Sequence, residues 1–219
     1  MVRLWDIADP VHPRALKTIL TGGEAPVGSV AFSADGHTLA SRDDDGTVRL
    51  WSLPQTVLTG STAGLSSVAF TPDGHTLAGG NYDGTVQLWD VVDPARPRPL
   101  GLPLIRNGAT VIEAVAFSAD GHTLASGDGD GTVQLWDVSD RVRPRPFGQP
   151  LSGGAAVLSV AFSPDGHTLA SRGADGMIRL WNLNVQYAVD RICAATGGLT
   201  PGQWNQYIPQ LRYQPSCGH

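Results

Sequence analysis

Residues 159–181 read SVAFSPDGHTLASRGADGMIRLW, and the chain carries this stretch four times with small changes. The other copies are SVAFSADGHTLASRDDDGTVRLW at 29–51, SVAFTPDGHTLAGGNYDGTVQLW at 67–89 and AVAFSADGHTLASGDGDGTVQLW at 114–136. A fifth fragment, VRLWD, opens the chain at residues 2–6. Self-similarity at a period of roughly 40 to 50 residues indicates an array of repeated structural units.

Each copy predicts three short β-strands. SVAF is the first and ends at a Pro-Asp-Gly or Ala-Asp-Gly turn, where glycine supplies the positive φ. HTLAS is the second, and the Asp-Gly pair after it predicts a hairpin turn. TVRLW or TVQLW is the third, and the variable stretch that follows, such as 15–20 or 56–60, supplies a fourth, outer strand. Because the inner strands are apolar at nearly every position, we expect both of their faces to be covered.

Over residues 2–183 the chain resembles the WD-repeat β-propeller family. The resemblance implies an all-β fold, a β-propeller of WD-type four-stranded blades that is partial, with about four and a half repeats. A partial blade is expected at 2–20 and further blades at about 27–60, 65–105, 111–151 and 156–183.

In the family that the chain resembles, a buried hydrogen-bond set joins an Asp, a Ser or Thr, the Trp and a His. Three repeats supply the first three members by position: Asp45, Ser41 and Trp51; Asp130, Ser126 and Trp136; Asp175, Ser171 and Trp181. In the remaining repeat Asp83 and Trp89 fit, but Gly79 replaces the Ser. The family's Gly-His ahead of the first strand is absent. The histidines lie instead in the turn between the first and second strands, at His37, His75, His122 and His167.

Residues 184–219 depart from the repeat and predict a helical C-terminal cap of two short helices on the last blade. Val185, Val189, Ile192 and Cys193 fall on one face of the first helix. The two cysteines, Cys193 and Cys217, either form a disulfide or remain free thiols, the default in a cytoplasmic protein. This tail also resembles the closing segment of large actinobacterial WD-repeat proteins, in which the propeller follows a signalling ATPase, a kinase or a helix-turn-helix module.

The opening strand matches the third strand of a blade, which predicts a C-terminal piece of a longer bacterial propeller or a short gene model of one. A chain complete as given would have to cover its open blade faces by dimerising. The N-terminus does not read as a signal peptide, which predicts a cytoplasmic location. No run of 18 or more apolar residues occurs, so we expect no membrane partner.

The residue patterns that carry catalysis are missing from the sequence. It contains no Gly-Lys pair for a phosphate-binding loop and no HExxH, CxxC or GxSxG motif. The acidic turns 43–46 and 128–131 faintly match a calcium loop but lack its bidentate Glu, so they are interpreted as hairpin turns. We therefore expect no catalytic residue, no cofactor and no metal. A net charge of −5 argues against a nucleic-acid partner.

The links between third and fourth strands concentrate arginine on one rim of the blades. The arginines are Arg14, Arg96, Arg98, Arg141, Arg143 and Arg145, whereas Asp43, Asp44 and Asp128 are assigned to the opposite rim. One interpretation is a basic and an acidic face for oriented docking of a charged partner. The other is that Pro and Arg make soluble, stiff loops. Glu113, Arg42 and Arg172 are the polar residues that interrupt the near identity of the blades.

The sequence thus predicts a non-catalytic protein–protein interaction scaffold whose partner is another protein or an intramolecular domain. The alternative is a C-terminal sensory or regulatory propeller of a larger signalling ATPase, kinase or transcriptional regulator whose active module lies upstream. An enzyme with its site in the propeller channel is disfavoured, because the blades are nearly identical and active sites break repeat symmetry.

Overall fold

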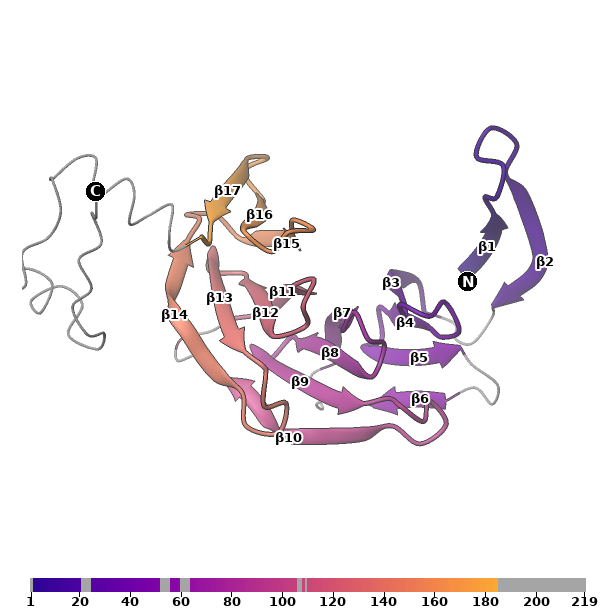
Figure 1. The fold of residues 1–219 in the computed structure, drawn as a ribbon, viewed down its shortest axis with the longest axis horizontal. Helices are drawn as coiled ribbons and strands as arrows, with labels where there is room; N and C mark the ends of the chain where they lie inside the picture. Colours follow the sequence, from indigo (N-terminus) through magenta and orange to yellow (C-terminus); the bar gives the residue numbers. More distant parts are fainter. Residues whose placement is uncertain are drawn as a thin grey trace, which may run out of the picture. The chain divides into compact units, whose positions relative to one another are not determined.

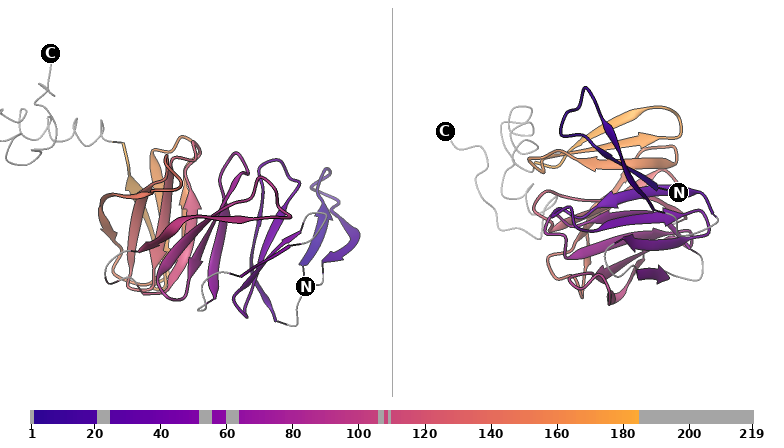
Figure 2. Two further views of the ribbon diagram at one scale, coloured as in Figure 1. Left: turned by 90° about the horizontal axis from the view of Figure 1, so that it is seen from below. Right: turned by 90° about the vertical axis from the view of Figure 1, so that its right-hand side faces the viewer.

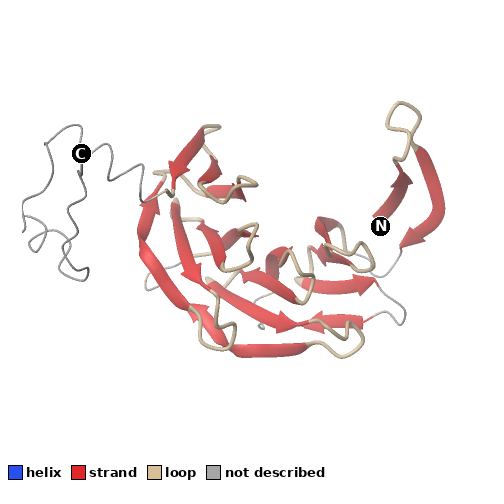
Figure 3. Ribbon diagram, viewed as in Figure 1, coloured by secondary structure: helices blue, strands red, loops and turns tan. Residues whose placement is uncertain are grey.

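The computed structural model describes residues 2–20, 25–51, 56–59, 64–105, 108 and 110–184. All regular secondary structure in these residues is β-strand, which confirms the all-β fold (Figure 3). The chain divides into two compact units, Met1–Leu180 and Trp181–His219. The predicted helices, Cys193 and Cys217 lie outside the described residues, so the helical cap and the disulfide stay predictions.

The strands form antiparallel sheets in chain order, each called a blade below (Figure 1). A hairpin of β1 (Val2–Asp6) and β2 (Arg14–Leu20) comes first. The first four-stranded blade contains β3 (Val27–Phe32), β4 (Leu39–Asp43), β5 (Thr47–Trp51) and β6 (Thr56–Thr59). The second contains β7 (Leu65–Phe70), β8 (Thr76–Asn81), β9 (Thr85–Asp90) and β10 (Arg98–Ile105). The third contains β11 (Ile112–Phe117), β12 (Thr123–Asp128), β13 (Thr132–Asp137) and β14 (Arg145–Ser152). The last has three strands, β15 (Val157–Phe162), β16 (Thr168–Gly173) and β17 (Ile178–Asn182).

The turn between the first and second strands of each blade is closed by a repeated set of side-chain hydrogen bonds. In the first four-stranded blade the Ser33 hydroxyl donates to Asp35 at 2.6 Å, and the Asp35 carboxylate also accepts the backbone N–H of His37. The same bonds recur at Thr71 and Asp73, Ser118 and Asp120, and Ser163 and Asp165. These bonds explain why the histidines are exposed turn residues.

The outer strands β10 and β14 share the sequence pattern Arg-Pro-x-Gly-x-Pro-Leu and an interruption of their pairing at the glycine. Gly101 and Gly148 have φ values of 60° and 71°, which L side chains rarely adopt. A Cβ on Gly101 would also meet the carbonyl oxygen of Val142. The irregularity therefore sets β10 directly against the loop between β13 and β14.

The cores of the molecule lie between neighbouring blades, which contact each other through their inner strands (Figure 2). Val48 and Leu50 of β5 pack with Leu65, Val68 and Leu77 of the next blade. The corresponding residues of β9, Val86 and Leu88, pack with Ile112, Val115 and Leu124. The inner strands of these blades are therefore covered on both faces, as their apolar sequences predict.

The first four-stranded blade and the last blade each present an apolar face to solvent. On β3, Val30 is 49% and Phe32 is 58% exposed, although Val68, the residue that corresponds to Val30 in the next blade, is buried. On β17, Ile178 is 73% and Leu180 is 71% exposed. Residues of the same type at the same strand positions are thus buried or partly buried between blades and exposed on β3 and β17.

Candidate functional site

The predicted Ser and Trp members of the blade network lie close together in two blades. The indole Nε1 of Trp51 donates to the Ser41 hydroxyl at 2.8 Å, and Trp136 donates to Ser126 at 3.0 Å. Ser171 is buried on β16 and Trp181 lies on β17. In the blade where Gly79 replaces the Ser, a Cβ at Gly79 would lie 2.8 Å from the Trp89 ring and would also meet Leu65. The Leu65 side chain thus occupies the space that a Ser side chain at position 79 would need.

The Asp of each predicted set accepts hydrogen bonds from the beginning of the strand that follows it. Asp45 accepts the backbone N–H of Thr47 at 3.0 Å and its hydroxyl at 2.7 Å, and these bonds hold the pKa of Asp45 below its usual value. Asp83 and Asp130 accept the same two bonds from Thr85 and Thr132. Asp175 accepts the Met177 N–H and pairs with Arg179 at 2.7 Å. These carboxylates therefore stabilise the hairpin turns.

Two aspartates assigned to the acidic rim are buried, which corrects that assignment. Asp43 is 2% and Asp128 is 0% exposed, and both end the second strand of a blade. Asp43 forms a buried ion pair with Arg49 of the neighbouring strand. Alternate residues of a strand point to opposite faces, and at these positions the side chain enters the interior. Asp44, the next residue, does lie at the surface.

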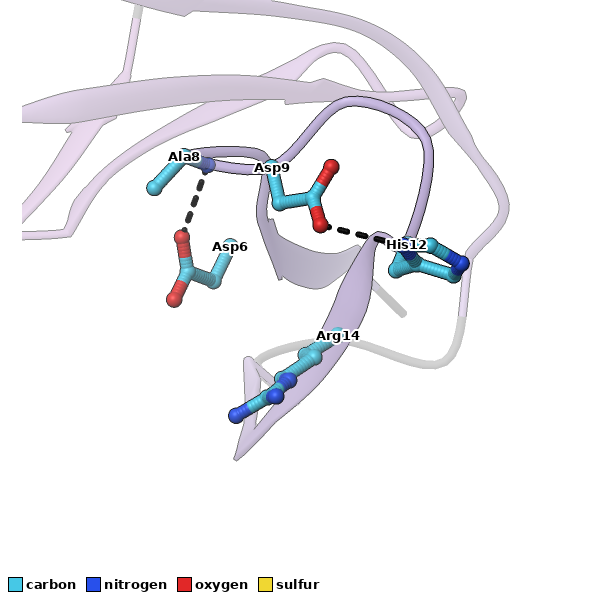
Figure 4. Close-up of a pocket in the computed structure, with 5 residues that line it drawn as sticks. All are labelled: Asp6, Ala8, Asp9, His12 and Arg14. Atoms are coloured by element: carbon cyan, nitrogen blue, oxygen red, sulfur yellow. Dashed lines mark hydrogen bonds and ion pairs between the residues drawn. The ribbon is translucent and has the colours of Figure 1, made fainter.

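The loops between third and fourth strands repeat the pattern Asp-x-x-Asp-x-x-(His/Arg)-Pro-Arg at 6–14, 90–98 and 137–145. Each Asp accepts a backbone N–H two residues further on, at 3.0 to 3.1 Å. In the first loop His12 Nδ1 also lies 3.0 Å from Asp9 Oδ2, and these two contacts lower the pKa of Asp9 (Figure 4). The loops are therefore fixed by their own carboxylates.

The same carboxylates lie beside the predicted partner-binding arginines. Arg143 pairs with Asp140 at 3.0 Å, and Arg98 and Arg145 lie opposite Asp90 and Asp137 in the strand pairing. Arg96 is exposed. The rim also carries the turn aspartates at 35, 73, 120 and 165, because connections between first and second strands leave the blade at the same end. This rim thus carries both charges, so its described residues do not form the basic face that one of the two interpretations predicts.

Arg141 links two neighbouring blades. Its guanidinium donates to Asp73 Oδ2 at 2.8 Å and to the Thr76 hydroxyl at 2.9 Å. Burial raises the pKa of Asp73, but the hydrogen bonds from Thr71 and Arg141 outweigh it and hold that pKa well below its usual value. Arg141 therefore has a structural partner within the chain.

Arg143 lines a groove of about 330 Å³, called the β10 groove below. Its lining combines apolar side chains and prolines with one arginine: Leu102, Pro103, Leu104, Ile105, Trp136, Val142, Arg143, Pro144 and Pro146. Leu102 is 84% exposed, and Ile105 and Val142 are exposed as well. The sequence gives little sign of this groove, because it is formed where β10 of one blade meets the β13–β14 loop of the next.

Within the described ranges, no group of three or more His, Cys, Asp or Glu side chains is arranged to hold a metal ion. Among the same residues, no helix has the length and apolar character needed to span a bilayer.

Comparison with protein families gives four matches to the family described as WD domain, G-beta repeat, at residues 14–52, 53–90, 105–137 and 148–182. A search of the curated proteins found no similar sequence. Each match runs from the region of an outer strand to the end of the third strand of the following blade.

Proposed function

Since the four matched segments cover more than half of the chain, this protein belongs to the WD-repeat family, and we propose that it is a non-catalytic scaffold that binds a protein partner in the β10 groove. WD repeats generally mediate protein–protein interaction. The observation that carries the proposal is the groove itself, which exposes Leu102, Ile105 and Val142 beside Arg143. Exposed apolar patches with a polar rim are typical of interaction sites on soluble proteins.

The groove suits recognition by side chains rather than by strand addition. β10 and β14 are edge strands, and edge strands can accept a further strand from a partner. Here Pro99 and Pro103 remove two backbone donors from β10, and the irregularity at Gly101 interrupts its pairing. We therefore expect an extended partner segment that places apolar side chains against Leu102 and Val142.

Arg143 adds a preference for an acidic residue in that segment. Its side chain is largely exposed, and only its Nε is within hydrogen-bonding distance of Asp140. The other guanidinium N–H groups are suited to a carboxylate of the partner. An apolar segment with one acidic residue therefore matches the groove in both shape and charge.

Panning a displayed library of random peptides against the chain tests the proposal. Peptides that combine apolar and acidic residues are expected to enrich, and Leu102→Lys or Val142→Lys should weaken their binding by about tenfold or more. Val11→Lys is the matched control, because Val11 is exposed at the corresponding position of the β1–β2 loop. The proposal is refuted when no peptide binds above background, or when both groove variants bind as the wild type does.

The other predictions on function concern the context of the chain. The regulatory propeller of a larger signalling protein, the intramolecular partner and the cytoplasmic, bacterial setting stay predictions. A screen of hydrolase substrates tests the non-catalytic role, since turnover that survives purification of the chain would contradict it.

A further inference from the structure

A buried arginine links the first four-stranded blade to the next one. The Nε of Arg42 donates to the Leu65 carbonyl at 2.7 Å, and its terminal nitrogen donates to the Tyr82 hydroxyl. The guanidinium also lies 5.5 Å from the centre of the Tyr82 ring. Leu65 is the first residue of β7, and Tyr82 directly follows β8. Arg42 therefore contacts both the first strand and the hairpin turn of the neighbouring blade.

The position of Arg42 in the other blades shows how each blade meets the next. Gly80 and Gly127 occupy it in the second and third blades, where a Cβ would lie 2.6 Å from Ile112 and 2.5 Å from Val157. In the last blade the residue at this position is Arg172. Arg172 lies opposite Ser159 in the strand pairing, as Arg42 lies opposite Ser29. Arg172 is exposed. The last blade thus carries the linking arginine at a surface that no described blade covers.

The apolar residues around Arg172 continue the same interface. Val86 and Leu88 of β9 are buried against the following blade, and Val133 and Leu135 of β13 are buried as well. The corresponding residues of β17 are Ile178 and Leu180, both largely exposed. The face of the last blade therefore has the composition of an interface between blades.

The open face of the first four-stranded blade offers the complementary positions. Val27 begins β3 as Leu65 begins β7, so its carbonyl corresponds to the acceptor that Arg42 uses. Asp44 follows β4 as Tyr82 follows β8. The Asp44 carboxylate pairs with Arg42 at 3.0 Å and is 51% exposed, which leaves acceptor positions for a second guanidinium. Val30 and Phe32 supply the apolar part of this face.

We infer that two copies of this chain associate head to tail, with the β15–β17 blade of one copy packed on the β3–β6 blade of the other. Arg172 then lies against Asp44 and the Val27 carbonyl of the second copy, and Ile178 and Leu180 cover Val30 and Phe32. The contact repeats the blade–blade interface within the chain and adds a complementary charge pair. It is heterologous, because the two copies contribute different faces.

Sedimentation velocity of the full chain over a range of concentrations is the first measurement. The wild type is expected to form species heavier than the 23.0 kDa monomer. Ile178→Asp and Val30→Asp should each abolish association, because each places an unpaired charge in an apolar contact. Val92→Asp, at an exposed loop residue outside both faces, should associate as the wild type does. Phe32→Ser is a second variant of the β3 face for use if Val30→Asp is misfolded by circular dichroism.

Mixing the variants tests the head-to-tail arrangement. Ile178→Asp keeps an intact β3 face and Val30→Asp keeps an intact β17 face, so an equimolar mixture should form a one-to-one dimer although each variant alone is monomeric. Arg172→Glu should raise the dissociation constant about tenfold, since it opposes Asp44 with a like charge. The inference is overturned by a wild type that stays monomeric, as when the β1–β2 hairpin covers β3. Association of either single variant, a mixture that stays monomeric, or an unchanged dissociation constant for Arg172→Glu also overturns it.

Discussion

Restoring the repeated serine in the second four-stranded blade should destabilise the protein. The other three copies have Ser where this one has Gly79, so the repeat alone suggests that Gly79→Ser improves the blade. In the structure a Cβ at this position meets Leu65 and lies 2.8 Å from the Trp89 ring. Overpacking of this kind costs about 1 to 3 kcal/mol. Replacing a strand glycine returns only about 0.5 to 1 kcal/mol of backbone entropy, so the net change should be a loss.

A smaller residue at position 65 should remove most of that loss. Val27 begins the blade that contains Ser41, so Leu65→Val reproduces a pairing already present in the chain. Alone, Leu65→Val should cost about 1 kcal/mol for the lost methylene. With Gly79→Ser, the space it opens admits the hydroxyl, which then accepts the Trp89 indole N–H for about 1 kcal/mol. The double variant should therefore be more stable than the sum of the single changes by about 1 to 3 kcal/mol.

Urea denaturation of the four proteins, followed by tryptophan fluorescence, gives the required free energies of unfolding. Trp89 is among the six tryptophans, so far-UV circular dichroism should accompany fluorescence as a second probe. Two results would refute the reasoning. One is a Gly79→Ser variant as stable as the wild type, and the other is strict additivity of the two changes.

The remaining predictions concern the turns and the groove. The four aspartates of the turns between first and second strands, at 35, 73, 120 and 165, have pKa values that are lowered in the folded state. Their stabilisation of the fold is therefore present above about pH 4 and is lost as the pH falls through the folded pKa values. Thermal melts at decreasing pH should show a falling melting temperature, and a constant midpoint down to about pH 2 would contradict the prediction. Arg141→Met should weaken this dependence, because Asp73 then titrates nearer its usual range, whereas Arg96→Met should leave it unchanged. Gly101→Ala should displace β10 from Val142 and lower the melting temperature. Gly148→Ala should lower it less, because a Cβ at Gly148 meets no atom within 4 Å. Equal decreases in melting temperature would refute the contact between Gly101 and Val142.

Much of the fold follows from local sequence. The four copies place the strands, and the Asp-Gly pairs place the turns, because only glycine takes the positive φ at positions such as Gly46 without strain. The Trp51–Ser41 and Trp136–Ser126 bonds also join residues that the repeat singles out. These features depend on contacts within one blade, where sequence spacing fixes the geometry.

Other features are harder to predict because they depend on where a strand ends, on contacts between blades, or on pairs of positions that local spacing does not connect. The position of Asp43 in an acidic turn predicts a surface residue, but the strand continues to it and directs its side chain inward to Arg49 of the same blade. The sequence groups Arg141 with five other arginines, but its guanidinium donates to Asp73, which lies 68 residues away in the neighbouring blade. The pairing of a large Leu65 with Gly79 was visible in the sequence as two departures from the repeat, but nothing local connects them.

The offset between sequence match and blade has an evolutionary consequence. The segment 14–52 contains β2 of the hairpin together with β3, β4 and β5 of the following blade, so the matched sequence unit is shifted by one strand from the unit that folds. Recombination between two repeats at the boundaries of these matches would insert an outer strand for the preceding blade along with three inner strands of a new one. Every internal blade stays four-stranded after such a duplication. Arrays of this kind can grow or shrink in a lineage without passing through an intermediate with a broken blade in its middle.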